Sequence, residues 1–119
     1  MVVLGASVEP ERYSNLVVRL LKEKGENVFP VNPKYNEIEG IKCYGSIRDI
    51  KDRIDIITIY INPEKITDDI INQIIDKKPE KVILNPGTER EDLEKILSNN
   101  NIKVIKACSI VLLKTNRFI

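Results

Sequence analysis

The segment that decides the fold of this chain is MVVLGASVEPERYSN, which spans residues 1–15. Its apolar run Val2 to Leu4 continues directly into Gly5-Ala6-Ser7, and after a polar bend an amphipathic segment begins at Tyr13. This pattern predicts a strand, a tight turn and the start of a helix. In an open parallel sheet, phosphate-bearing ligands bind at such a junction, because the helix N-terminus offers unpaired N–H groups and the positive end of its dipole. We therefore expect the other segments to be arranged around a site at this position.

The composition predicts a single domain over residues 1–119 with an ordinary hydrophobic core. The 19 basic and 18 acidic residues give a net charge of +1 without a basic cluster, so we expect neither nucleic acid nor a membrane as a partner. We expect no signal peptide, and the sequence has no apolar run long enough to span a bilayer. With only two cysteines, Cys43 and Cys108, the prediction is a reduced, cytoplasmic protein.

Strand and helix patterns alternate along the whole chain, which predicts an α/β domain with a mainly parallel sheet. The predicted strands cover residues 2–4, 27–31, 55–61, 81–84 and 102–105. The predicted helices cover residues 13–24, a segment that begins at Pro63 and buries Ile66, Ile70, Ile71, Ile74 and Ile75, and residues 88–98.

Shorter patterns fill the gaps between these elements. Residues 41–44 resemble an exposed edge strand, which would make a homodimer plausible. Ser46 with Asp49, and Thr88 with Glu91, have the spacing of capping boxes. The tail from residue 108 to 119 contains apolar residues 110–113 and is expected to dock on the body of the domain.

Right-handed crossovers then constrain the topology. The simplest arrangement places the strand of residues 2–4 between those of residues 27–31 and 55–61, so that the strand order reverses beside it. The prediction is a Rossmann-like, doubly wound sheet of about five strands with helices on both faces. Its switch-point crevice is lined by Gly5-Ala6-Ser7, Asn32-Pro33-Lys34 and Ile61-Asn62-Pro63.

The residues of this crevice point to a nucleotide but do not identify it. Gly5-Ala6-Ser7 keeps only the first glycine of the dinucleotide fingerprint, so a simple tight turn explains it equally well. Asn32-Pro33-Lys34 stands where NAD-binding folds carry an acidic residue. A lysine there disfavours NAD and suits a ribose that carries a phosphate, as in NADP or coenzyme A, although a solvated turn lysine is an equal alternative.

Chemistry beyond binding has little support in the sequence. The chain has no histidine, which removes the commonest general base and metal ligand. Cys43 and Cys108 have no C-x-x-C spacing and are expected to be small buried residues. Residues 89–92 are interpreted as the solvated first turn of a helix. A non-catalytic binding domain without a metal is therefore favoured over an enzyme.

Four segments together resemble one family. They are V-L-G-A-S-x-x-P-x-R-Y-S, V-x-P-V-N-P-K-Y, G-x-K-C-Y-x-S-I-x-D-I, and N-P-G-T-E at residues 85–89. In this order they are similar to the CoA-binding domain family, which includes stand-alone CoA-binding proteins, the N-terminal domain of the succinyl-CoA synthetase alpha subunit, and the matching domain of NDP-forming acyl-CoA synthetases. The resemblance covers nearly the whole chain and implies a Rossmann-like fold that binds coenzyme A at the switch point.

The resemblance also implies which residues contact the ligand. The implied contacts are Gly5, Ala6 and Ser7 at the phosphates, Arg12 and Ser14 at the start of the first helix, Asn32, Pro33 and Lys34 near the adenosine ribose and its phosphate, Tyr60, Ile61 and Pro63 at the adenine, and Asn85, Pro86 and Gly87 toward the pantetheine end.

Two departures from the family bear on activity. The synthetases phosphorylate a histidine outside this domain, and the Gly-Lys-Gly pattern that follows their second strand is absent, since Lys34 precedes Tyr35. The expectation is therefore a module that binds coenzyme A or acyl-CoA. The alternatives are an NAD(P)-linked redox enzyme or sensor, and the CoA-binding subunit of a split acyl-CoA synthetase that works with a partner subunit.

Overall fold

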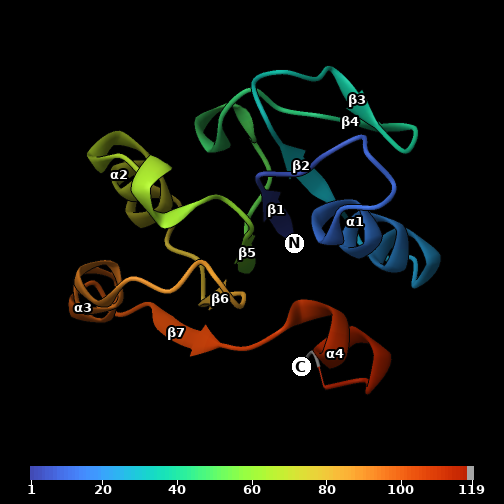
Figure 1. Ribbon diagram of the computed structural model, residues 1–119. Helices are drawn as coiled ribbons and strands as arrows, with labels where there is room; N and C mark the ends of the chain where they lie inside the picture. Colours follow the sequence, from blue (N-terminus) through green and yellow to red (C-terminus); the bar gives the residue numbers. More distant parts are fainter. Residues whose placement is uncertain (118–119) are drawn as a thin grey trace.

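A computed structural model describes residues 1–117 of the chain. Five parallel strands form one sheet in the order β2-β1-β5-β6-β7. The helices α1 and α4 lie on one face of this sheet, and α2 and α3 lie on the other (Figure 1). The strands are β1 (Val2–Leu4), β2 (Phe29–Val31), β5 (Ile56–Ile59), β6 (Lys81–Leu84) and β7 (Lys103–Lys106), and the helices are α1 (Tyr13–Glu23), α2 (Asp68–Lys77), α3 (Glu91–Asn99) and α4 (Ser109–Lys114). The predicted Rossmann-like fold is confirmed.

The central strand explains why its sequence is apolar without interruption. Val2 and Leu4 pack into the core cluster beneath α2 and α3, whereas Val3 packs into the cluster beneath α1 and α4. Successive side chains of a strand point to opposite faces, so a strand covered on both sides needs apolar residues throughout. β1 pairs with β2 through Val3 and Pro30 and with β5 through Val3 and Thr58. The strand order thus reverses beside β1, as predicted.

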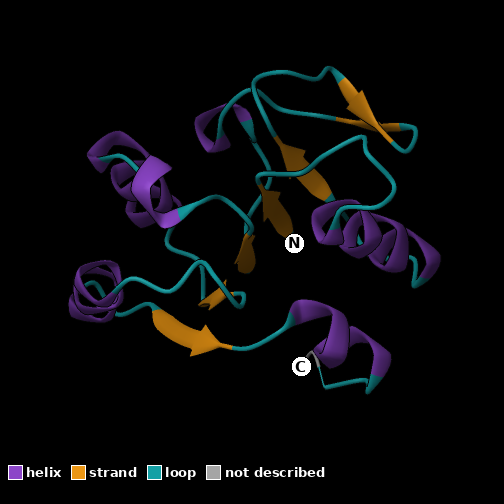
Figure 2. Cartoon of the chain, viewed as in Figure 1, coloured by secondary structure: helices purple, strands orange, loops and turns teal. Residues whose placement is uncertain are grey.

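The segment predicted as an edge strand is different in the structure. Residues 41–44 contribute β4 (Ile41–Lys42), which pairs antiparallel with β3 (Glu37–Ile38) in a hairpin separate from the main sheet and close to α1 (Figure 2). Tyr44 alone bridges β2, and its N–H donates to the Pro30 carbonyl oxygen at 2.9 Å. The predicted strand is thus confirmed at residues 41–42, but it pairs with β3 and not with the main sheet, because the chain turns back at residues 39–40, both in the left-handed region.

The helix predicted from Pro63 is divided into two. A short 3₁₀ helix, η2 (Pro63–Lys65), begins as expected with the Asn62 side chain accepting from the Glu64 N–H at 3.0 Å. The α-helix begins later, because the Thr67 hydroxyl caps the Ile70 N–H at 3.2 Å. Its first turn carries two acidic residues that complement the helix dipole.

Both predicted capping boxes are wrong. Ser46 precedes the short 3₁₀ helix η1 (Ile47–Asp49). The Asp49 N–H donates to the Ser46 carbonyl oxygen, and within the described residues the Ser46 hydroxyl caps no backbone N–H group. The Thr88 hydroxyl is buried and donates to the Asn85 carbonyl oxygen at 2.8 Å, so α3 starts later, without a side-chain cap. Thr88 lies in the turn after β6, and α3 begins only at Glu91, with Arg90 as its N-cap.

The tail docks on the body as expected over its described part. α4 packs beside α1 on the same face of the sheet (Figure 1), and Leu113 is buried in the cluster that also holds Val17 and Leu21. Residues 118 and 119 of the predicted docking tail lie outside the described residues. Within residues 1–117, no helix has the length and apolar character needed to cross a membrane.

Candidate functional site

Two adjacent hollows lie at the ends of β1, β2, β5 and β6. The first hollow has a volume of about 530 Å³ and the second about 310 Å³, and Tyr60 lines both. The first is lined by Gly5, Ser7, Glu9, Glu11, Arg12, Tyr13, Ser14, Asn32, Lys34, Tyr35, Tyr60 and Lys65, and the second by Tyr60, Ile61, Asn62, Pro63, Pro86, Gly87 and Thr88.

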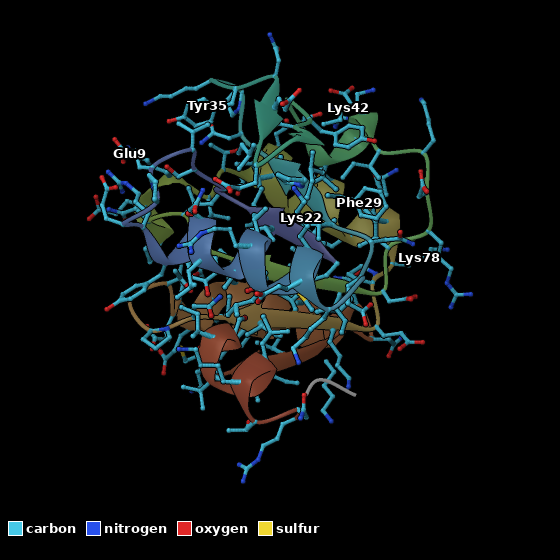
Figure 3. The ribbon with its side chains drawn as sticks, turned by 90° about the vertical axis from the view of Figure 1, so that its right-hand side faces the viewer. Glu9, Lys22, Phe29, Tyr35, Lys42 and Lys78 are labelled. Carbon is cyan, nitrogen blue, oxygen red and sulfur yellow. The ribbon has the colours of Figure 1, made fainter. Side chains whose placement is uncertain are left out.

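The first hollow lies at the carboxyl edge of the sheet. Glu9 and Tyr35, which line it, are at one end of the molecule, and Phe29 and Lys78 are at the opposite end (Figure 3). Phe29 opens β2 and Lys78 follows α2, so the opposite end is the amino edge of the strands. The loops predicted to line a switch-point crevice are therefore brought together.

Gly5 is required by the close approach of two strands. Its φ angle is +88°, and its N–H donates to the Val31 carbonyl oxygen at 2.9 Å. A Cβ atom at this position would lie 3.1 Å from the backbone of Tyr60 and Ile61. Any side chain would be strained by the φ angle and would push apart β1 and the end of β5. This glycine therefore keeps the floor of the crevice narrow.

The loop after Gly5 is held by side-chain amides. Asn32 Nδ2 donates to the Ala6 carbonyl oxygen at 2.8 Å, and Asn32 Oδ1 accepts from the Lys34 N–H at 2.9 Å. The Ser7 hydroxyl accepts from the Glu9 N–H at 3.1 Å and keeps its own proton for a further bond. Asn32 lines the hollow, but its amide already has partners within the protein.

The start of α1 offers unpaired backbone donors to the first hollow. Arg12 is the N-cap, no side chain caps the helix, and no acidic residue stands in its first turn. Within residues 1–117, the N–H groups of Tyr13 and Ser14 have no acceptor. By contrast, Thr67 caps α2. The N-terminus of α1 therefore retains the capacity to bind an anion.

The three basic side chains of the first hollow are not equivalent. Arg12 Nε lies 2.5 Å from Glu9 Oε2, and this hydrogen bond raises the pKa of the guanidinium. Lys34 and Lys65 form no ion pair within the described residues. Sequence reasoning missed Lys65, although its position two residues after Pro63, in the loop that follows β5, was a usable signal. Lys34 and Lys65 are thus the cations available to a ligand.

The second hollow rests on a buried polar network. Asn85 Nδ2 donates to Thr58 Oγ1 at 2.6 Å and to the Ile59 carbonyl oxygen at 2.9 Å, and Asn85 Oδ1 accepts from the Ser109 N–H at 2.8 Å. The Thr58 and Ser109 hydroxyl groups are 2.7 Å apart. The Asn85 amide therefore joins β5, β6 and α4 and orients the loop that carries Pro86 and Gly87.

Arg90 is the exception to the interpretation of residues 89–92 as a solvated first turn, since Glu89, Glu91 and Asp92 are exposed as expected. Its side chain is only 25% exposed, and Nη1 donates to the carbonyl oxygens of Pro63 (3.0 Å) and Ile66 (2.8 Å). Asp92 accepts from the same guanidinium at 2.6 and 2.9 Å, and this bond lowers the pKa of its carboxyl group. Arg90 therefore ties the loop after β5 to the start of α3, behind the second hollow.

Tyr60 stands between the two hollows with an unpartnered hydroxyl group. This oxygen is buried and has no hydrogen-bond partner within residues 1–117. Burial, together with the nearby Cys108, raises the pKa of the phenol, and the neighbouring Ser109 side chain opposes this shift only in part, without a hydrogen bond of normal geometry to the hydroxyl. Cys43 is buried as expected, and burial raises its pKa as well, whereas Cys108 is only half-buried. Among the described residues no group of acidic residues and cysteines could hold a metal ion.

Most of the predicted site residues line one of the two hollows. Three do not: Ala6 is fully buried, Asn85 is used in the network above, and Pro33 lies outside both. The predicted residues that do line them are Gly5, Ser7, Arg12, Ser14, Asn32, Lys34 and Tyr60 in the first hollow and Tyr60, Ile61, Pro63, Pro86 and Gly87 in the second. Glu9, Glu11, Tyr13, Tyr35 and Lys65 were not predicted.

The sheet is doubly wound and parallel, and its switch point carries unpaired helix N–H groups and lysines without ion pairs among the described residues. These features are typical of the class of Rossmann-like nucleotide-binding domains. The family comparison makes this class more specific. Residues 1–114 match the model of the family described as CoA binding domain, and the chain belongs to this family.

Relatives of this chain include acetate–CoA ligases. An ADP-forming acetate–CoA ligase of Methanocaldococcus jannaschii is 39% identical over 59 residues, which cover 50% of this chain and 8% of that protein. The subunit alpha of ADP-forming acetate–CoA ligase II of Pyrococcus furiosus is 38% identical over 64 residues, covering 53% and 14%. This chain therefore spans only a small part of the length of these ligases.

A solved structure agrees with the fold over nearly the whole chain. The crystal structure of an uncharacterized protein has a TM-score of 0.90 and 38% sequence identity, and the match covers 98% of this chain and 95% of the other.

Proposed function

We propose that this domain binds coenzyme A or an acyl-CoA without catalysing a reaction by itself. The observation that carries the proposal is the first hollow, where unpaired N–H groups of α1 meet Lys34 and Lys65. A ligand with several phosphates suits such donors, because hydrogen bonds to charged groups are the stronger ones. Membership of the CoA binding domain family favours coenzyme A among such ligands.

The two hollows divide naturally between the two halves of this ligand. The first is polar and carries the cations, so we assign it to the phosphorylated adenosine half. The second is lined by Pro86 and Gly87, which the family resemblance places toward the pantetheine end, so we assign it to the pantetheine arm. Ile61 and Pro63 line the same hollow, and this assignment moves them from the adenine to that arm. Tyr60, which lines both, stands where the two halves of the ligand join.

Titration calorimetry with coenzyme A, dephospho-coenzyme A, NAD and NADP tests the proposal. We expect coenzyme A to bind best and dephospho-coenzyme A to bind more weakly, because Lys34 then loses the 3′-phosphate. A ligand that binds only the folded chain also raises its melting temperature. Preference for NAD or NADP would replace the proposal with a redox cofactor role.

The Lys34→Glu variant tests the assignment of the 3′-phosphate. It should weaken coenzyme A by about tenfold or more and dephospho-coenzyme A much less, since the lost charge pair includes the 3′-phosphate. Lys95→Glu makes the same charge change on the exposed face of α3 and should change neither affinity. Equal losses for both ligands in Lys34→Glu would remove Lys34 from this role.

A second candidate function is the CoA-binding subunit of a split acyl-CoA synthetase. The observation that favours it is the similarity to the subunit alpha of the Pyrococcus furiosus ligase. It predicts weak binding of coenzyme A to the chain alone and tighter binding after addition of an ATP-grasp subunit encoded beside it. Full affinity of the isolated chain, unchanged by that subunit, would favour the stand-alone module.

A further inference from the structure

Asn15 has no role in the sequence patterns, yet it is a junction of the candidate site. It lies in the first turn of α1 and its side chain is fully buried. Nδ2 donates to the Ser7 carbonyl oxygen at 2.9 Å and to Glu39 Oε2 at 3.1 Å, and Oδ1 accepts from Arg19 Nε at 2.8 Å. One buried amide therefore joins the loop between β1 and α1, the hairpin of β3 and β4, and α1 itself.

The bond to Ser7 fixes the orientation of one peptide group. In a trans peptide the carbonyl oxygen and the next N–H point in opposite directions, and the chain contains no cis peptide. Because Asn15 is buried, the Ser7 carbonyl points into the protein, and the Val8 N–H must point outward. Asn32 holds the Ala6 carbonyl in the same way, which orients the N–H of Ser7.

Both N–H groups are available to a ligand. Within the described residues, neither the Ser7 N–H nor the Val8 N–H has an acceptor. Ser7 lines the first hollow together with Tyr13 and Ser14, whose N–H groups are also unpaired. If the Ser7–Val8 peptide turned over, a carbonyl oxygen would replace a donor and would repel an anion.

We propose that Asn15 is a positioning residue for anion binding, which holds the Ser7–Val8 peptide so that the Val8 N–H donates to a phosphate or diphosphate group in the first hollow. The identity of the ligand, coenzyme A, rests on the proposed function. The expectation that a phosphate or diphosphate group binds here does not. Asn32 acts alongside Asn15 through the Ser7 N–H. The ligand class recognised here is a phosphate ester or diphosphate, bound by backbone donors in addition to Lys34 and Lys65.

The test follows backbone amides by ¹⁵N–¹H NMR during titration with coenzyme A and, separately, with inorganic pyrophosphate. In the wild-type chain the Val8 and Ser7 amide protons should move downfield with both probes. Asn15→Asp keeps the acceptor for Arg19 but loses both N–H donors. It should abolish the Val8 shift and weaken binding by about tenfold, the effect of one hydrogen bond to a charged group.

Two control variants separate positioning from general stability. Glu39→Gln changes the other acceptor of Asn15 and leaves the bond to Ser7, so the Val8 shift and the affinity should be retained. Asn100→Asp removes an amide that donates to the Ile96 carbonyl at the end of α3 and makes the same charge change away from the site, so it should not affect binding. If Asn15→Asp does not fold, Asn15→Ser replaces it in both the NMR and the binding experiments.

The outcomes distinguish this inference from the proposed function. If coenzyme A binds the wild-type chain while the Val8 amide does not move, the inference is wrong and the proposed function stands. If coenzyme A does not bind but pyrophosphate moves the Val8 amide, the proposed function is wrong and the inference stands. If neither probe moves it, or if the folded Asn15 variants bind as tightly as wild type, the inference is overturned.

Discussion

At the scale of single residues, the Tyr60 hydroxyl gives a prediction about stability. It is buried without a partner, and an unsatisfied buried hydroxyl costs free energy that a phenyl ring avoids. We expect Tyr60→Phe to leave the free energy of unfolding unchanged or to raise it by up to about 1 kcal/mol. Urea unfolding of both chains measures this. A loss of stability would show that the hydroxyl has a favourable interaction in the native protein.

The same residue gives the pH dependence its direction. Because burial raises the pKa of the Tyr60 phenol in the folded chain, the unfolded chain ionises first, near pH 10. The contribution of the neutral Tyr60 phenol to the free energy of unfolding is therefore complete below about pH 10 and declines as the pH rises above that value. Unfolding at pH 9 and pH 11 should show a smaller decline in Tyr60→Phe than in wild type. Tyr13→Phe, which alters an exposed phenol, should decline as wild type does.

Residues also mark the limit of what the sequence could predict at the site. The turn at Gly5 and the cation at Lys34 could be predicted, because both follow strands in a recognisable order. The role of Asn15 could not, because its partners Ser7 and Glu39 come together only when the loop and the hairpin pack against α1. The ion pair that engages Arg12 depends likewise on the bend of the loop.

At the scale of elements, local patterns were reliable where they matched the packing. The strands were predicted because residues such as Val2 and Val82 are buried in short apolar runs. The Thr88 and Glu91 pair has the spacing of a capping box, but the Thr88 hydroxyl lies in the turn after β6, where it donates to the Asn85 carbonyl oxygen. A capping hydroxyl must accept from an N–H of the first helical turn, and Thr88 is not the N-cap because α3 begins only at Glu91, after Arg90.

A substitution of Arg90 tests whether its hydrogen bonds hold η2 against the start of α3. Arg90→Met keeps the aliphatic stem and removes the donors to the Pro63 and Ile66 carbonyl oxygens. We expect the free energy of unfolding to fall by about 1–2 kcal/mol and the affinity for coenzyme A to fall with it, because Pro63 lines the second hollow. Asp92→Asn, which removes only the exposed partner, should have little effect. Unchanged stability in Arg90→Met would contradict this role.

At the scale of the whole molecule, the net charge of +1 is too small to attract an anionic ligand. Attraction must come from the local arrangement at the first hollow, where Glu9 engages Arg12. Charges separated by more than about 8 Å are largely screened at physiological salt. The position of a charge should therefore affect binding more than the total does.

Two variants with the same net charge test this directly. Glu9→Gln releases Arg12 and should tighten the binding of coenzyme A by about two- to fivefold at low salt, the usual worth of an exposed ion pair. Glu80→Gln makes the same change just before β6, at the amino edge of the sheet, and should leave the affinity unchanged. Calorimetry at low and high salt should show the advantage of Glu9→Gln shrinking as salt is added, because the freed guanidinium is exposed to solvent. If both variants tightened binding equally, the affinity would depend on the overall charge of the chain. The assignment of the phosphates to the first hollow would then be wrong.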